Sequence, residues 1–227
     1  MNQLTIENPI SCFGIGVHSG NKTQVTLRPA SENVGIIFIR TDVSSVDNKI
    51  LANYSSVFDT SLSTSIKNSA NVSVSTIEHL MAALWGVGVD NALVELDGGE
   101  IPIMDGSSEP FVFMLECAGI ANLAAKRKVL RVLKTVEVRE GGSVARISPN
   151  KEGDCGMLLN IEIDFKHSLI GKQMAEYDFR DITFKQSVSR ARTFGFEHEV
   201  NAMRSMGLAL GGSLDNAVVV GKDTILN

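Results

Sequence analysis

The first half of the chain alternates short β-prone runs with two helical segments, and no other feature of the sequence constrains the fold as strongly. The β-prone runs span 24–28, 35–40 and 91–96. The first helix is predicted from 75–78, which has the spacing of a capping box, and its helix-forming residues end near Gly86. The second helix covers about 107–117, with Pro110 in its first turn and Gly119 as its C-cap.

A polar junction at 122–128 separates this half from the rest of the chain. Strand-like runs resume after it, at 129–132 and at 158–164. We therefore predict a first domain over residues 1–126 and a second domain over residues 127–227.

The second domain shows strands without the core helices that should follow them. Only one late helix, over about 197–206, and a final strand over 217–220 can be predicted. We therefore expect the second domain to be incomplete, the chain to be truncated at its C-terminal side, and the exposed sheet to present one apolar face.

Composition excludes several classes of protein. The 227 residues are 44% hydrophobic, enough for a sizeable core, and the net charge of -5 comes with no basic run that would track a nucleic-acid backbone. Cys12, Cys117 and Cys155 are too few and too widely spaced for a disulfide framework, so we expect reduced, mostly buried thiols. With no signal peptide and no transmembrane segment, the expected location is cytoplasmic.

Candidate chemistry starts from the four histidines, because few residues are available for a metal site. Glu78 and His79 open the first predicted helix, where a carboxylate beside an imidazole can place a general base next to a metal-bound water. Taken alone, the pair is better explained by Glu78 completing a helix cap. His167 is interpreted as a turn residue and His198 as a solvated one.

Two further segments can each be given a structural or a functional interpretation. Residues 14–20 (GIGVHSG) match no phosphate-binding pattern and predict a turn. Residues 192–196 (RTFGF) place a hydroxyl among aromatic rings, either as a half-buried connection or as part of a site. The apolar and small residues around them could pack in the core or line a narrow channel: Phe194, Val200, Ala209, Ser213, Ala217 and Val219.

Six segments in fixed order give the chain a family resemblance over nearly its whole length. They are 14–20, 75–80, 101–107, 163–167, 189–196 and 207–217. The chain resembles the UDP-3-O-acyl-N-acetylglucosamine deacetylases, hydrolases of lipid A biosynthesis in Gram-negative bacteria. The resemblance implies a monomeric α+β protein, a two-domain sandwich of sheets with helices packed between them, that acts on UDP-3-O-acyl-N-acetylglucosamine.

The resemblance also implies a role for each site residue. Such enzymes hold one Zn²⁺ through two histidines and an aspartate, with water in the fourth position. His79 matches the first ligand, Glu78 the general base, and Thr193 the hydroxyl that stabilises the oxyanion. The substrate-binding set consists of His18, Phe194 near the sugar, and the acyl-passage residues Val200, Ala209, Ser213, Ala217 and Val219.

One departure from the family pattern affects the metal site. The remaining histidine and aspartate ligands, and a further catalytic histidine, correspond to positions after residue 227. His18, His167 and His198 match other places in the pattern and do not replace them. We therefore expect this chain to bind zinc weakly and to have little or no deacetylase activity. The alternative is a non-catalytic fragment or pseudo-enzyme that binds acyl chains and nucleotide sugars.

Overall fold

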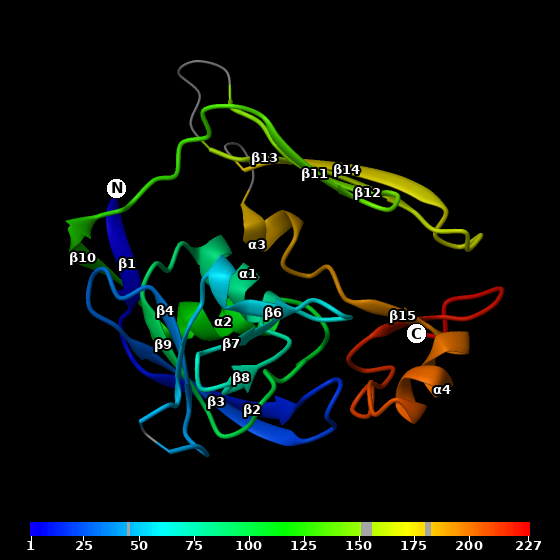
Figure 1. The fold of residues 1–227 in the computed structure, drawn as a ribbon, viewed down its shortest axis with the longest axis horizontal. Helices are drawn as coiled ribbons and strands as arrows, with labels where there is room; N and C mark the ends of the chain where they lie inside the picture. The colour runs from blue at the N-terminus through cyan, green and yellow to red at the C-terminus, as the bar shows by residue number, and fades with distance from the viewer. Residues whose placement is uncertain (45, 151–155, 180–182) are drawn as a thin grey trace.

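The computed structural model describes residues 1–44, 46–150, 156–179 and 183–227. It has the α+β fold expected from the sequence, with several small sheets and two packed helices (Figure 1). The largest sheet has the strand order β2 (Ile10–Ile15), β3 (Lys22–Pro29), β9 (Ala92–Leu96), β4 (Ile36–Arg40) and β5 (Lys49–Leu51). Within this sheet β4 and β9 are parallel, and the other three neighbouring pairs are antiparallel.

Two smaller sheets complete the first half. β1 (Asn2–Ile6) pairs with β10 (Ile120–Lys126), and a three-stranded sheet contains β6 (Val57–Asp59), β7 (Ser65–Lys67) and β8 (Ser73–Val74), preceded by a 3-10 turn at Tyr54–Ser56. β10 lies where a polar junction was predicted, and 129–132 is not a strand, so both predictions are wrong. Side chains 121, 123 and 125 of β10 are half-buried and alternate with exposed side chains. Because positions 121 and 125 are alanines, the sequence shows little of this hydrophobic alternation.

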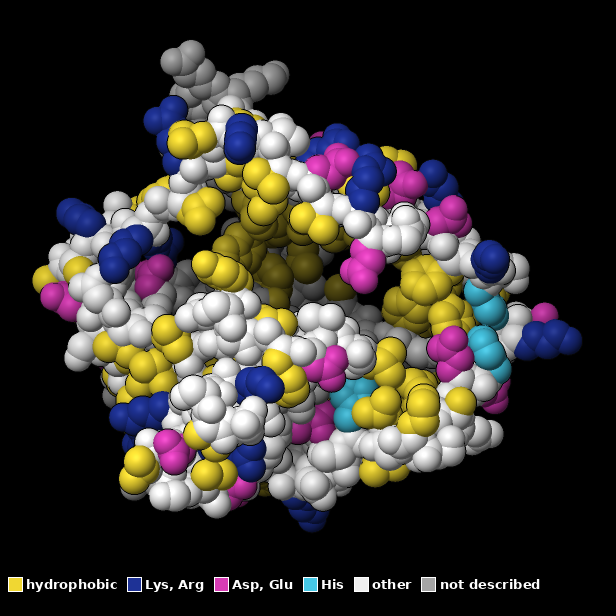
Figure 2. Space-filling model, in the orientation of Figure 1, with side chains coloured by type: hydrophobic (Ala, Val, Ile, Leu, Met, Phe, Trp, Pro, Cys, Tyr) yellow, Lys and Arg dark blue, Asp and Glu magenta, His cyan; other side chains and the backbone are white. Residues whose placement is uncertain are grey.

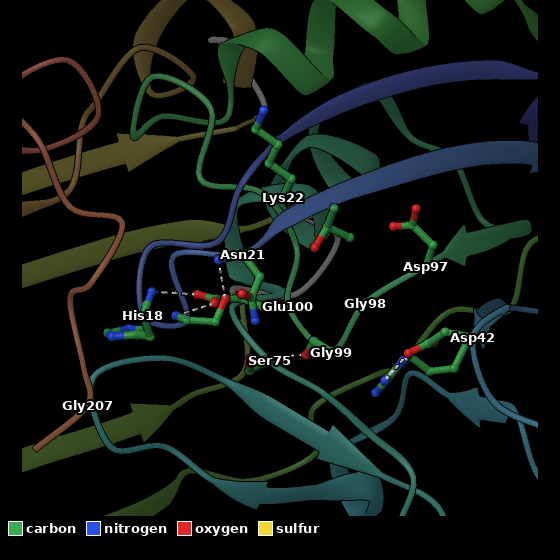
Figure 3. Close-up of a pocket in the computed structure, with 13 residues that line it drawn as sticks. His18, Asn21, Lys22, Asp42, Ser75, Asp97, Gly98, Gly99, Glu100 and Gly207 are labelled. Carbon is green, nitrogen blue, oxygen red and sulfur yellow. Dashed lines mark hydrogen bonds and ion pairs between the residues drawn. The ribbon is translucent and has the colours of Figure 1, made fainter.

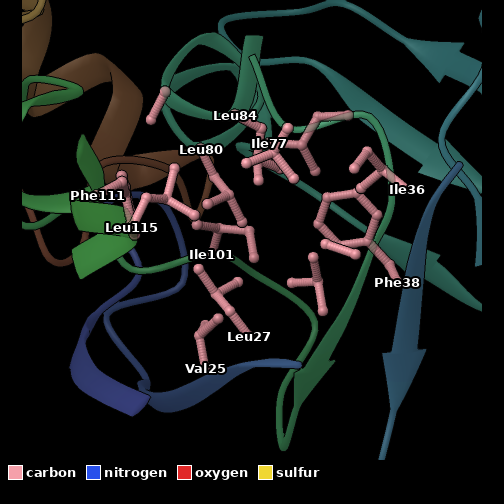
Figure 4. Packing of buried hydrophobic residues seen from close by; sticks show 14 of the residues in the cluster. Val25, Leu27, Ile36, Phe38, Ile77, Leu80, Leu84, Ile101, Phe111 and Leu115 are labelled. Atoms are coloured by element: carbon pink, nitrogen blue, oxygen red, sulfur yellow. The ribbon is translucent and has the colours of Figure 1, made fainter. Parts of the chain in front are cut away.

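The two predicted helices cover the inner face of the largest sheet. α2 (Glu109–Ala118) has Pro110 in its first turn and Gly119 as its C-cap, as predicted. α1 (Glu78–Val87) begins later than expected and ends at Gly88 in the left-handed region, with φ 86°. The apolar core lies between these helices and the sheet (Figure 4), and its largest fully buried members include Leu27, Phe38, Leu80, Leu84, Phe111 and Leu115.

Two antiparallel hairpins follow in the second half. They are β11 (Val136–Glu140) with β12 (Ser143–Ile147), and β13 (Leu158–Asp164) with β14 (Lys172–Asp178). Figure 1 shows them on the opposite side of α1 and α2 from the largest sheet, so the helices lie between layers of strands. Val138 and Met174 are 64% and 75% exposed. Hydrophobic side chains border a hollow beneath the hairpins (Figure 2).

The last segment contains α3 (Phe184–Ser187), β15 (Phe194–Phe196), α4 (Glu197–Ser205) and β16 (Val218–Val220), with β15 and β16 parallel. The late helix and final strand were predicted, and α3 was not. α3 attaches this segment to the first half, because Phe184 is buried and Lys185 forms a 2.6 Å ion pair with Glu116 of α2.

The cysteines only partly match the expectation of buried thiols. Cys12 is half-buried, Cys117 is exposed, and Cys155 lies outside the described residues. Across the ranges that the structure describes, the helices are all too short to cross a membrane.

Candidate active site

Glu78 and His79 occupy the first two positions of α1, but Glu78 does not cap that helix. The N-cap residue Ile77 makes no side-chain capping bond. Instead, Glu78 Oε2 accepts a hydrogen bond from the backbone N–H of Thr64, at 3.0 Å. Within the described ranges no hydrogen bond reaches Oε1. The capping interpretation of Glu78 is therefore wrong, and one carboxylate oxygen at the helix start is available for chemistry.

His79 follows Glu78 in α1 and is half-buried. Burial lowers the pKa of the His79 imidazole, and the negative charges of Glu78 and Asp105 partly oppose that shift. The imidazole is therefore neutral at neutral pH. A neutral imidazole has a nitrogen lone pair, which is the form that ligates a metal or accepts a proton.

A loop at Asp105 and Gly106 connects this pair to Thr193. The N–H of Thr193 donates to the carbonyl of Gly106 at 2.8 Å. Gly106 has φ +88°, and a Cβ there would stand 2.3 Å from the carbonyl oxygen of Asn216. The backbone of Thr193 is therefore bound to the residue that follows Asp105, and Asp105 is one of the two carboxylates whose charge opposes the lowering of the His79 pKa.

Arg192 fastens the same loop to the end of the chain. Its Nε donates to the carbonyl of Asp105, and its Nη2 donates to the carbonyl of Asp215, both at 2.7 Å. The carbonyl of Thr193 accepts from the N–H of Val218 at 2.9 Å. The backbone around Thr193 is thus held from both sides.

Phe194 belongs to an aromatic cluster. It is 41% exposed, and its ring centroid lies 5.5 Å from that of Phe165 and 5.9 Å from that of Phe196. The rings of His167 and His198 lie against Phe196 at 5.3 and 5.5 Å. These two histidines therefore contribute ring surface beside the candidate sugar contact.

The acyl-passage residues lie in one segment beside His18. Val200 is on α4, Ala209 and Ser213 are in the loop that follows, and Ala217 and Val219 lie at β16; Ser213 is exposed and the other four are half-buried. The loop is held by its backbone, because the N–H of Leu210 donates to the His18 carbonyl and that of Gly211 to the Val17 carbonyl, both at 3.1 Å. Nδ1 of His18 is buried without a hydrogen-bond partner in the described structure.

A polar cavity of about 700 Å³ opens beside the His18 loop (Figure 3). Its lining includes His18, Lys22, Arg40, Asp97 and Glu100. Neither Glu78 nor His79 lines it. The Glu78 and His79 pair therefore lies outside the lining of this cavity.

The metal-binding capacity of the site is incomplete. Among the residues with described positions, no group of three or more His, Cys, Asp and Glu side chains is arranged to hold a metal ion. His79 is a suitable single ligand, but a catalytic zinc site needs three protein ligands. The residues present do not by themselves fit such a site.

Four residues that organise this region were not identified as such from the sequence: Thr64, Glu100, Asp105 and Arg192. Asp105 and Arg192 lie within segments that carry the family resemblance, and this was the available signal. Thr64 contributes only its backbone N–H, so its side chain gives no signal. Glu100 follows a diglycine turn, which predicts an exposed position rather than a buried one.

Comparison with known proteins gives a consistent match. The family model described as UDP-3-O-acyl N-acetylglycosamine deacetylase matches residues 3–227. Curated relatives named UDP-3-O-acyl-N-acetylglucosamine deacetylase include those of Phenylobacterium zucineum (47% identical over 227 residues), Chromohalobacter salexigens (46% over 229) and Pasteurella multocida (45% over 229). The alignments cover 100% of this chain and 76%, 74% and 73% of those relatives.

Proposed function

The chain belongs to the UDP-3-O-acyl N-acetylglycosamine deacetylase family, and we propose that the site at the start of α1 removes the acetyl group of UDP-3-O-acyl-N-acetylglucosamine in lipid A biosynthesis. The observation that carries this proposal is the pairing of Glu78 and His79. Glu78 has one carboxylate oxygen without a partner in the described structure, and His79 beside it has its pKa lowered by burial.

The proposed reaction is hydrolysis of a linear amide. Glu78 accepts a proton from a water molecule as the water oxygen attacks the acetamide carbonyl carbon. The hydroxyl of Thr193 donates a hydrogen bond to the oxyanion that forms. The C–N bond then breaks, the proton passes to the leaving nitrogen, and the products are acetate and the free amine of the sugar.

We propose His79 as one ligand of a Zn²⁺ ion. Because the described residues contain no group of three ligands, the 227-residue chain should bind zinc weakly and release acetate slowly. Zinc binding by a single imidazole would also weaken below neutral pH, since only the unprotonated ring is a ligand.

Substrate recognition is assigned to the segment after Thr193. The partly exposed ring of Phe194 supplies apolar surface for the sugar. The acyl chain would lie along the half-buried small and branched residues Val200, Ala209, Ala217 and Val219, with Ser213 at the exposed edge. His18, whose carbonyl binds this segment, would contact the substrate from the first domain.

A second candidate function is a non-catalytic module that binds the acylated nucleotide sugar. The lack of a three-ligand group among the described residues favours it, because the binding segment does not depend on a metal. The two functions differ in chemistry and share the same ligand.

One experiment separates the two candidates. The purified chain is incubated with UDP-3-O-acyl-N-acetylglucosamine over a range of Zn²⁺ concentrations, and acetate release and substrate binding are measured in parallel. The deacetylase proposal predicts slow acetate release that increases with added Zn²⁺. Binding with no acetate release at any Zn²⁺ concentration would instead support the binding module.

A further inference from the structure

Glu100 is a buried carboxylate that accepts hydrogen bonds from two separate loops. It is 4% exposed. Its Oε1 accepts from the N–H of His18 at 2.9 Å, and its Oε2 accepts from the N–H of Ser19 at 2.8 Å (Figure 3). Oε1 also accepts from the hydroxyl of Thr76 at 3.0 Å. No cation pairs with it in the described parts of the chain. A carboxylate so deeply buried is stable only while such donors stay in place.

The first of these loops carries His18. Its tight turn is closed by the N–H of Gly20, which donates to the carbonyl of Gly16 at 3.0 Å. A Cβ on Gly16 would stand 2.2 Å from Oε2 of Glu100, so the close approach of the carboxylate requires glycine there. The loop also binds the acyl-passage segment through the His18 carbonyl.

The second loop leads directly into α1. Thr76 has φ +57°, a left-handed conformation that is costly for a β-branched residue, and it lies two positions before Glu78. Its neighbour Ser75 is held to the strand-like backbone at Gly99 and Ile101. The Thr76 hydroxyl bond to Glu100 fixes the residue that turns the chain into the catalytic helix.

We infer that Glu100 is a positioning residue that holds the His18 loop and the start of α1 at a fixed separation. This role rests on the proposed function for the importance of His18 and Glu78. The geometry is independent of the proposed function, because three donors from two loops converge on one buried side chain.

Glu100→Gln is the variant that tests this role with the least change in shape. An amide has a single oxygen, so it can accept from the N–H of His18 or from that of Ser19, but its NH₂ group must face the other. The matched control is Asp97→Asn. Asp97 follows β9 near Glu100 and accepts from the N–H of Gln24 at 2.8 Å, but it hydrogen-bonds to neither loop.

The measurement is amide hydrogen exchange by NMR on the 227-residue chain. Glu100→Gln should accelerate exchange at His18 and Ser19 about 10-fold or more, the effect of losing a hydrogen bond to a charged acceptor. The amides of Val25 and Leu27 in β3 should not change. Asp97→Asn should leave the His18 and Ser19 rates unchanged.

Thr76→Val tests the other contact and covers the case in which Glu100→Gln does not fold. Valine keeps the branched shape but lacks the hydroxyl. It should accelerate exchange at Met81, whose N–H donates to the Ile77 carbonyl in the first turn of α1, and leave His18 unchanged. It should also lower kcat for acetate release more than it changes KM, because Glu78 would be misplaced.

Unchanged exchange at His18 and Ser19 in Glu100→Gln would overturn the inference. A uniform acceleration that includes Val25 and Leu27 would also overturn it, since Glu100 would then contribute only general stability. If no variant and not even the unaltered chain releases acetate, the proposed function fails, but the exchange rates still decide the role of Glu100.

Discussion

The ring of Phe184 occupies the space that a side chain on Gly86 would need. A Cβ at position 86 would stand 2.2 Å from Cδ1 of Phe184 and 2.9 Å from its Cβ. The Trp85 ring lies beside the same phenylalanine in a T-shaped arrangement, with 6.1 Å between ring centroids. The ring of Phe184 therefore packs where α1 has no side chain, and this contact attaches α3, and the segment after it, to the first half of the molecule.

Gly86→Ala should destabilise the fold by displacing Phe184. Overpacking of this kind costs about 1–3 kcal/mol, and the better helix propensity of alanine offsets at most about 1 kcal/mol of it. The free energy of unfolding in urea measures the net loss. Gly142→Ala is the control, because a Cβ at Gly142 meets nothing within 4 Å and should change stability by less than about 0.5 kcal/mol. A Gly86→Ala variant as stable as the unaltered chain would contradict this packing.

Gly106→Ala should lower the free energy of unfolding by more than the positive φ alone explains. Alanine at φ +88° pays the left-handed cost of about 1–2 kcal/mol and also meets the Asn216 carbonyl oxygen. Gly141→Ala pays only the backbone cost, because Gly141 has φ +55° with nothing within 4 Å. The loss of unfolding free energy at position 106 should exceed that at 141 by about 1 kcal/mol or more. Equal losses would show that the Asn216 contact relaxes freely.

The ends of α2, the start of α1 and the position of α3 show which features of the fold could be predicted from the sequence and which could not. Pro110 and Gly119 mark the ends of α2 because their effects are local, and that helix was predicted correctly. The spacing at 75–78 predicted a capping box, but the hydroxyl of Ser75 donates to the carbonyl of Gly99, 24 positions away. α3 is four residues long and is stabilised by the packing of its Phe184 against Gly86, far away in the sequence. Local sequence signals could therefore not identify it.

The candidate site could be predicted only for residues that lie in the segments of the family resemblance. The resemblance selected Glu78, His79 and Thr193, and in the structure the backbone of Thr193 is bound to Gly106, the residue after Asp105. The supports of the site act through backbone groups, as at Thr64, or through a buried charge, as at Glu100. Neither kind of contact has a sequence pattern, because the partners lie in different loops.

Stability should decrease with acidity through His79 in the metal-free chain. Burial holds the pKa of His79 below its ordinary value of about 6.5, despite the charges of Glu78 and Asp105. The unfolded chain therefore binds more protons than the folded chain below that pH, and the unfolding free energy falls as the pH drops through about 6.5. Urea unfolding between about pH 5 and 7.5, with a chelator present, should show a shallower slope for His79→Asn than for the unaltered chain. Identical slopes would contradict the buried, neutral imidazole.

Arg192→Lys should loosen the backbone that carries Thr193 although it keeps the charge. A lysine ammonium cannot reproduce the fork that reaches the carbonyls of both Asp105 and Asp215. Amide exchange at Thr193 should accelerate about 5-fold or more, since one neutral hydrogen bond contributes about 1 kcal/mol. Arg190→Lys is the matched control, because Arg190 is exposed and makes no hydrogen bond in the described structure. Equal exchange in both variants would remove Arg192 from this role.

The central claim is that Glu78 is the base of the deacetylation, and acetate release by Glu78→Gln with excess Zn²⁺ tests it most directly. Glutamine can still accept the Thr64 N–H but cannot take a proton from water. We predict that the variant keeps its fold and that its rate falls about 100-fold or more below that of the unaltered chain. Glu109→Gln, at the corresponding first position of α2, should retain the full rate. Undiminished acetate release by a folded Glu78→Gln variant would contradict the assignment.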